Sequence, residues 1–174
     1  MSKKAFSAFQ RGRCNAARQH TESPIVKERP AQPGVLYCKG CKAQHHDKRW
    51  YAPDEAKQFP ESMEMHETLC PGCYSVENHI CNGEVVLRGP KLDAMRTTVH
   101  YLIANIEKKC WHDNPKSRIL SFNDLGETIY VTTTTEWLAL RIGKEVRKAL
   151  KGNLNIRRFP EESFARVQWT SPQA

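Results

Sequence analysis

The sequence lacks any apolar run of about 18 residues, the length that a membrane-spanning helix requires. Its first residues, Met1 to Arg13, include basic side chains with no apolar core behind them, which argues against a secretory signal peptide. We therefore expect no membrane insertion and a cytoplasmic location. Thiols stay reduced in the cytoplasm, so paired cysteines are better explained there as metal ligands than as disulfides.

The common catalytic motifs are also missing. The chain has no Ser/His/Asp set, no glycine-rich phosphate loop and no dinucleotide fingerprint. Residues 66–70, His-Glu-Thr-Leu-Cys, begin like a zinc-protease motif, but the fifth position is cysteine where that chemistry needs a second histidine. A zinc-deaminase motif fails too, because Pro71 lies inside the C-x2-C pair rather than before it. We predict that the protein is not an enzyme.

Cysteine, by contrast, is well represented, and four of the seven cysteines form two C-x2-C pairs. The paired residues are Cys38, Cys41, Cys70 and Cys73. Gly40 and Gly72 allow a tight turn inside each pair, and two such turns facing each other supply a tetrahedron of thiolates. The pairs predict one structural zinc ion, since four thiolates leave no open position for a catalytic water.

The spacing between the two pairs is longer than usual. It amounts to 28 residues, against roughly 15 to 20 in the commonest arrangement, so the loop through Trp50, Tyr51 and Pro60 is expected to add a hairpin or another excursion. An iron-sulfur cluster is the alternative occupant for four thiolates. An alternative in which the four thiols are only buried core residues is improbable, because it leaves the two C-x2-C pairs as a coincidence.

The charge of the chain favours a polyanionic partner. Lys and Arg number 27 against 19 Asp and Glu, giving a formal net charge of +8. Residues 1–34 contain seven of the basic residues and only two acids, together with three prolines and no apolar period, which predicts a flexible basic arm. Phe6 and Phe9 in this arm could stack on bases; a solvated tail without a partner is the alternative. The arm residues expected to contact nucleic acid are Lys3, Lys4, Arg11, Arg13 and Arg18.

The remainder of the chain divides into a cysteine-bearing part, residues 35–89, and a part with regular apolar periodicity, residues 90–170, followed by a tail at 171–174. Gly89 and Pro90 mark the boundary between these two parts, because proline lacks a backbone donor and suits the first turn of a following helix. From Lys91 the apolar residues recur in steps of three and four, which predicts an amphipathic helix that ends at Asn114 and Pro115.

A second unit of helix and strands follows the first helix. Residues 119–122 and 129–132 read as the two arms of a hairpin. Thr133 and Glu136 have capping-box spacing, so a second helix is expected to begin there and to stop at Gly152. Two last strands are predicted around residues 154–156 and 164–169. The fold class that results is α+β: a zinc ribbon followed by two helices over one face of a four-stranded, mainly antiparallel sheet, in the order α-β-β-α-β-β.

A second group of basic residues is predicted on the polar side of the second helix and in the strand after it. It comprises Arg141, Lys144, Arg147, Lys148, Lys151, Arg157 and Arg158. These residues could form one basic patch for nucleic acid, and a solvated helix face is the alternative.

Several segments resemble a family of small bacterial proteins without settled function, distantly related to the export adaptor of the large ribosomal subunit. The segments are 38–41 (CKGC), 49–50 (RW), 66–73 (HETLCPGC), 83–89 (GEVVLRG) and 131–143 (VTTTTEWLALRIG). The resemblance covers roughly Val35 to Trp169 and implies binding to the large ribosomal subunit without catalysis. The chain has two C-x2-C pairs rather than the adaptor's longer cysteine array and is shorter, so the resemblance implies ribosome association in assembly, stress or subunit protection rather than export.

The leading hypothesis from the sequence is therefore a noncatalytic zinc-ribbon protein that binds ribosomal RNA or the ribosome. A DNA-binding or transcription-associated zinc protein is the second hypothesis, and a protein-interaction adaptor is the third. Charge alone does not separate these three partners.

Overall fold

The computed structural model describes residues 34–173 of the 174-residue chain. The basic arm predicted from the sequence, including Lys3, Lys4, Arg11, Arg13 and Arg18, lies outside the described residues. The described part contains two β-sheets and three α-helices, which confirms the predicted mixture of helices and strands.

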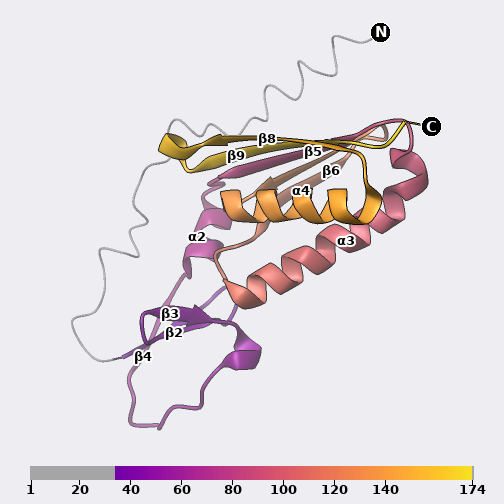
Figure 1. The fold of residues 1–174 in the computed structure, drawn as a ribbon. Coiled ribbons are helices and arrows are strands. Elements are labelled where there is room, and N and C mark those ends of the chain that lie inside the picture. Colours follow the sequence, from indigo (N-terminus) through magenta and orange to yellow (C-terminus); the bar gives the residue numbers. More distant parts are fainter. Residues whose placement is uncertain (1–33, 174) are drawn as a thin grey trace.

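The smaller sheet lies in residues 34–82, which we call the cysteine module (Figure 1). Its strands are β1 (Val35–Cys38), β2 (Gln44–His46), β3 (Arg49–Tyr51) and β4 (Met65–Thr68), in the order β3-β2-β1-β4. β1 pairs antiparallel with β2 and parallel with β4. β2 and β3 form a hairpin whose two turn residues, Asp47 and Lys48, have positive φ, the geometry of the tightest hairpin turns. This hairpin accounts for much of the long spacing between the cysteine pairs, as expected.

Two further short elements complete the cysteine module. A single turn of 3-10 helix, η3 (Pro53–Glu55), follows β3, and helix α2 (Pro71–Glu77) follows β4. The chain then passes directly into the larger sheet.

The larger sheet has five strands in the order β6-β7-β5-β9-β8. The strands are β5 (Gly83–Arg88), β6 (Ile119–Asp124), β7 (Thr128–Thr133), β8 (Asn153–Phe159) and β9 (Phe164–Thr170). All neighbours pair antiparallel except β5 and β9, which are parallel. A 3-10 turn, η4 (Pro160–Glu162), connects β8 to β9.

Two helices cover one face of this sheet and form what we call the helical layer, α3 (Leu92–Asp113) and α4 (Glu136–Leu150) (Figure 1). α3 has 22 residues, but no helix within residues 34–173 combines the length and the apolar character needed to cross a membrane. Side chains alternate across a strand, so every second strand residue meets the helices and the rest face away. The core that results includes Val85, Leu87, Ile129, Val131, Val167 and Trp169 from the strands, and Val99, Ile103, Leu138, Ile142 and Val146 from the helices.

The predicted four-stranded sheet is wrong, because β5 is a fifth strand and occupies the centre. Residues 83–89 had been assigned to the cysteine-bearing part of the sequence. Five of the six β5 residues, Gly-Glu-Val-Val-Leu, are buried. A strand buried on both faces does not need the alternation of apolar and polar residues that marks a half-exposed strand. The run is short and lies next to the cysteines, so the sequence does not indicate which of the two sheets it joins.

The start of the second helix also differs from the capping-box prediction. The N-cap is Thr135, whose hydroxyl oxygen accepts a hydrogen bond from the backbone N–H of Leu138 at 3.3 Å. Thr133 is instead a buried residue at the end of β7, and its hydroxyl donates to the carbonyl of Thr135 at 2.9 Å. Thr133, Thr134 and Thr135 are all residue types that can cap a helix. Thr133 pairs within β7 and is therefore not the cap.

Because β5 is central, we predict that a fragment beginning at Asn82 unfolds cooperatively and that one beginning at Pro90 does not. The shorter fragment loses Val85 and Leu87 from the core, each worth about 1.5 to 3 kcal/mol when fully buried, and breaks the pairing of β7 and β9 with their shared neighbour. Small domains have about 5 to 15 kcal/mol of stability in total. Urea titrations followed by circular dichroism on both fragments, each ending at Gln173, test this; equal midpoints would show that β5 is dispensable.

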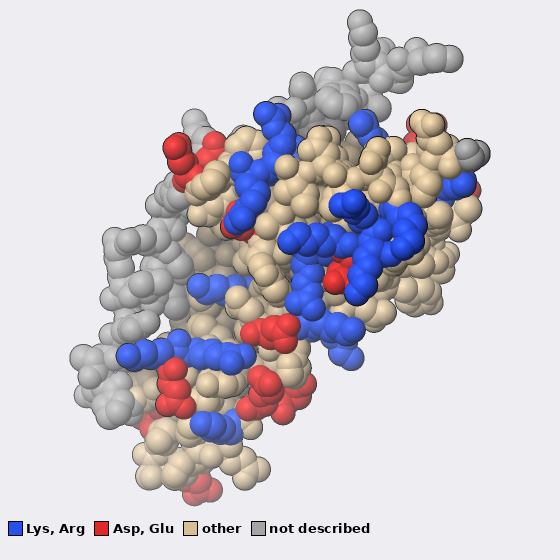
Figure 2. Space-filling model, viewed as in Figure 1, with Lys and Arg blue, Asp and Glu red and all other residues tan. Residues whose placement is uncertain are grey.

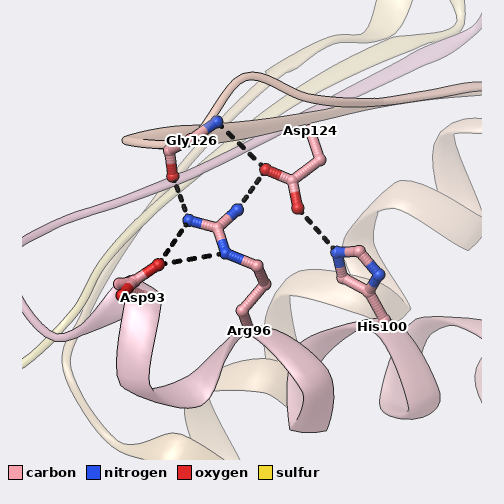
Figure 3. A network of polar contacts seen from close by, with 5 residues as sticks. All are labelled: Asp93, Arg96, His100, Asp124 and Gly126. Carbon is pink, nitrogen blue, oxygen red and sulfur yellow. Dashed lines mark hydrogen bonds and ion pairs between the residues drawn. The ribbon is translucent and has the colours of Figure 1, made fainter.

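A polar network ties α3 to the turn between β6 and β7 (Figure 3). The Arg96 guanidinium bonds the Asp93 carboxylate at 3.1 Å, and also the Asp124 carboxylate and the Gly126 carbonyl. His100 Nε2 lies 2.9 Å from the second oxygen of Asp124. The hydrogen bond from Arg96 holds the pKa of Asp124 below its ordinary value, and the same contact raises the pKa of Arg96.

This network predicts a pH-dependent contribution to stability. A carboxyl whose pKa is lowered by folding stabilises the native state above its unfolded pKa, about 3.9 for aspartate, and that contribution is lost as the pH falls through the folded pKa. Asp124→Asn should therefore lower the urea midpoint at pH 7, and the difference from the parent protein should shrink as the pH is lowered below about 4. Glu127→Gln, which removes an acid from the same turn, is the control; a constant difference at every pH would argue against the network.

Candidate metal centre

The four paired cysteines converge on one point of the cysteine module. The sulfurs of Cys38, Cys41, Cys70 and Cys73 all lie within 4.8 Å of one another, and those of Cys41 and Cys70 are 3.6 Å apart. A tetrahedral ion with metal–sulfur bonds of about 2.3 Å holds its sulfurs about 3.8 Å apart. The observed separations fall around that value, so the four thiols fit a single ion.

The first pair belongs to a tight turn at the end of β1. The backbone N–H of Cys38 donates to the carbonyl of Ala43 at 2.8 Å, and Lys42, with φ of 65°, donates to the carbonyl of Cys38 at 2.9 Å. A Cβ atom at Gly40 would lie 3.1 Å from the sulfur of Cys73, closer than most carbon–sulfur contacts. Glycine at this position lets the two pairs approach each other.

The second pair sits in the first turn of α2 rather than in a tight turn like the first. Cys70 is the N-cap of the helix and Pro71 occupies its first position, where a missing N–H costs nothing. The sulfur of Cys70 accepts from the backbone N–H of Cys73 at 3.4 Å, and the sulfur of Cys38 accepts from the backbone N–H of Cys70 at 3.2 Å. Backbone donors aimed at sulfur favour the thiolate form, which is the form that binds metal.

The proton equilibria of the four thiols depend strongly on one another. The hydrogen bond from Cys41 lowers the pKa of Cys38, while the contact with Cys38 raises the pKa of Cys70. Burial, and then the charge of Cys41, raise the pKa of Cys73 to about 12. Four thiolates repel one another at these distances unless a cation lies among them. The cluster is therefore chemically suited to a metal ion that prefers sulfur.

The apolar core around the cluster is small. Only Cys38, Ala43 and Cys70 are buried in it, with Trp50 and Leu69 packed against them from the side. So few apolar groups cannot offset the conformational entropy of ordering these loops. Metal binding supplies the missing stabilisation in small domains of this kind.

The cysteine module rests against the C-terminal end of α3. Gly72 faces the carbonyl of Pro115 so closely that a Cβ atom would collide with it. Arg49 Nη2 donates to the carbonyl of Asp113 at 3.3 Å, and His112 Nε2 lies 3.2 Å from a carboxylate oxygen of Asp54. The cluster is thus held next to the helical layer and not on a free arm.

The basic residues predicted to bind nucleic acid divide between two faces. Lys144, Arg147 and Lys148 are exposed on α4, and Lys151 is exposed at its C-cap. Figure 2 shows Lys and Arg gathered over the region where Figure 1 draws α3 and α4. Arg141 is half-buried, 3.7 Å from a carboxylate oxygen of Asp113. None of the four exposed residues has an ion-pair partner within the described part of the chain.

The two arginines of β8 do not extend this group as one patch, because neighbouring strand residues face opposite ways. Arg158 bonds Glu136 at the start of α4 at 2.8 Å. Arg157 lies opposite Arg166 in the register, and Arg166 alternates with the core residues Val167 and Ala165. Arg157 is therefore on the face of the sheet that the helices leave open.

Sequence reasoning missed other residues of the helical layer. Lys108 and Lys109 are exposed on α3, and Tyr101 and Trp137 are among the most exposed large side chains of the described residues. The apolar stripes of α3 and α4 could have indicated them, since residues between the stripe positions face outward.

Comparisons with protein-family models, with curated proteins and with solved structures find no match to this chain.

We predict that Cys70→Ser abolishes metal binding and unfolds the cysteine module, because three thiolates and a hydroxyl make a much weaker site. Structural tetrathiolate sites are worth on the order of 10 kcal/mol, more than the few buried side chains around this one can replace. Elemental analysis of protein purified under reducing conditions and the chemical shifts of β1 to β4 measure the two effects. Cys110→Ala, which removes a buried thiol outside the cluster, should keep the metal; a metal-loaded Cys70→Ser protein would contradict the assignment.

Proposed function

We propose that this protein is a noncatalytic zinc-ribbon protein that binds RNA, with ribosomal RNA or the ribosome as its target. The observation that carries the proposal is the placement of a closed four-thiol cluster beside a helical layer whose exposed cations lack acidic partners among residues 34–173. The four-thiol cluster offers a site for a structural metal ion. The exposed cations of the helical layer offer a surface for a polyanion.

Zinc is the proposed occupant because the four sulfurs all lie within 4.8 Å of one another, which is compatible with a single tetrahedral ion. A cluster of several iron atoms puts more atoms between its thiolates and would hold them farther apart. When bound, zinc would cross-link β1, β4 and α2 through Cys38, Cys41, Cys70 and Cys73.

The proposed absence of catalysis rests on the donor set. Four protein ligands complete the coordination of zinc, so no position remains for a water or a substrate. The cluster then contributes to function only by holding the module in place.

RNA is the proposed partner because of charge and of the resemblance described above. Phosphates favour a surface with several exposed lysines and arginines, and counterion release makes such binding sequence-tolerant. The resemblance to relatives of the ribosomal export adaptor directs the choice among polyanions to ribosomal RNA.

The test is ultraviolet crosslinking in cells followed by sequencing of the nucleic acid that copurifies with the full chain. We expect enrichment of ribosomal RNA over the total transcript pool, compared with a Cys38→Ser/Cys70→Ser control. Genomic DNA would support the transcription-associated alternative, and a captured protein without nucleic acid would support the adaptor alternative. Binding in vitro should weaken with salt, with a logarithmic slope of about 0.7 for each phosphate contacted on a single strand.

A further inference from the structure

A groove of about 600 Å³ runs between the cysteine module and the helical layer. It is lined by Asp54, Asn105, Lys108, Lys109, Trp111, His112, Asp113 and Arg141. Asp54 comes from η3 of the cysteine module, while the others come from α3 and α4. The cysteine module therefore contributes one side chain to the edge of a groove that is built mainly by the two helices.

The charges in this groove leave two cations available. The acids are engaged, since Asp113 lies 3.7 Å from Arg141 and Asp54 lies 3.2 Å from His112. Lys108 and Lys109 are exposed and have no carboxylate within ion-pair distance in residues 34–173. These two ammonium groups are therefore available to an anionic ligand in the groove.

An exposed aromatic side chain lies next to the groove. The Arg141 guanidinium, which lines the groove, is 5.3 Å from the ring centroid of Trp137, and this indole is 44 % exposed. Lys144 and Lys148 follow Trp137 at helical steps of seven and eleven residues, so the three lie along one exposed side of α4. On α3, Tyr101 is 70 % exposed and precedes Lys108 by two turns.

Aromatic faces interleaved with cations are the pattern by which proteins hold single strands, because each base offers a face for stacking and each nucleotide a phosphate. A duplex hides its base faces and could use only the lysines. RNA rather than DNA exposes unpaired bases in loops, bulges and ends. The surface thus has the chemistry for unpaired RNA.

We infer that the groove and the adjoining side of α4 bind single-stranded RNA, with a base stacked on Trp137 and phosphates held by Lys108, Lys109 and Lys144. This inference rests on the proposed function and narrows it to one surface and one kind of strand. The open face of the sheet, with Arg88 and Arg157, is not the binding surface.

The test measures the affinity of the full zinc-loaded chain for a fluorescent single-stranded RNA of about 12 nucleotides by anisotropy. Trp137→Ala should weaken binding by about 5- to 150-fold, the range reported by alanine substitution for one stacked base, and Trp137→Phe should restore most of it. Lys108→Gln/Lys109→Gln should reduce the logarithmic salt slope by about 1.4, which corresponds to two phosphates. Zinc content and circular dichroism confirm that each variant is folded.

Two matched controls lie outside the surface. Leu125→Ala removes an exposed apolar side chain from the turn between β6 and β7, and Arg88→Gln/Arg157→Gln removes two charges from the open face of the sheet. Both should bind RNA like the parent protein.

The outcomes separate this inference from the proposed function. RNA binding that survives in the Trp137 and lysine variants, or that is lost in the Arg88/Arg157 control, overturns the surface but leaves an RNA-binding protein. Equal or tighter binding of the annealed duplex, or of single-stranded DNA of the same sequence, overturns the choice of unpaired RNA. No binding to any RNA overturns both.

Discussion

The pairing of β5 with strands on both of its sides is the interaction on which the arrangement of the chain depends. β7 pairs with it antiparallel, whereas β9, the last strand of the chain, pairs with it in parallel. Because parallel neighbours need a long crossover, everything from α3 to β8 lies between these two paired strands in the sequence. The same strand directly follows the cysteine module, so its position in the sheet fixes where that module leaves the larger sheet.

The module has a second attachment, at the C-terminal end of α3. Contacts of Gly72 with Pro115, Arg49 with Asp113 and Asp54 with His112 join it to the end of the helix. The four cysteines themselves do not line the groove beside α3, but Asp54 of the same module does. The candidate metal site and the groove therefore meet at one junction between the module and α3.

The long periodic elements were predictable from the sequence, and the central strand was not. α3 and α4 show apolar steps of three and four, and the β6–β7 and β8–β9 strands alternate or carry turn residues between them. β5 is short and buried on both faces, so it has no period, and the strands it joins lie about 50 and 80 residues away. The local sequence around β5 contains no information on which distant strands will pair with it.

The candidate metal ligands were predictable for a different reason. A spacing of two residues lets one turn present two thiols to the same ion, so Cys38, Cys41, Cys70 and Cys73 could be identified as a set without knowledge of the fold. The basic surface was predicted only in part, because Arg157 and Arg158 are neighbours in sequence but lie on opposite faces of the sheet. Lys108 of α3 meets Arg141 of α4 at one groove only through the packing of the two helices.

The parallel pairing of β1 with β4 has a consequence for the unfolded chain. The two strands are joined by a hairpin and an irregular segment, and Cys38 and Cys70, at or just beyond their ends, are 32 positions apart. Closing a loop of that length costs on the order of 3 to 4 kcal/mol of chain entropy by the estimate used for disulfide cross-links. A metal ion bridging the two positions acts on this loop as a reversible cross-link, one whose presence depends on the supply of metal in the cell. We therefore expect the pairing of β1 with β4 to be the part of the fold that depends most directly on how much metal the cell supplies.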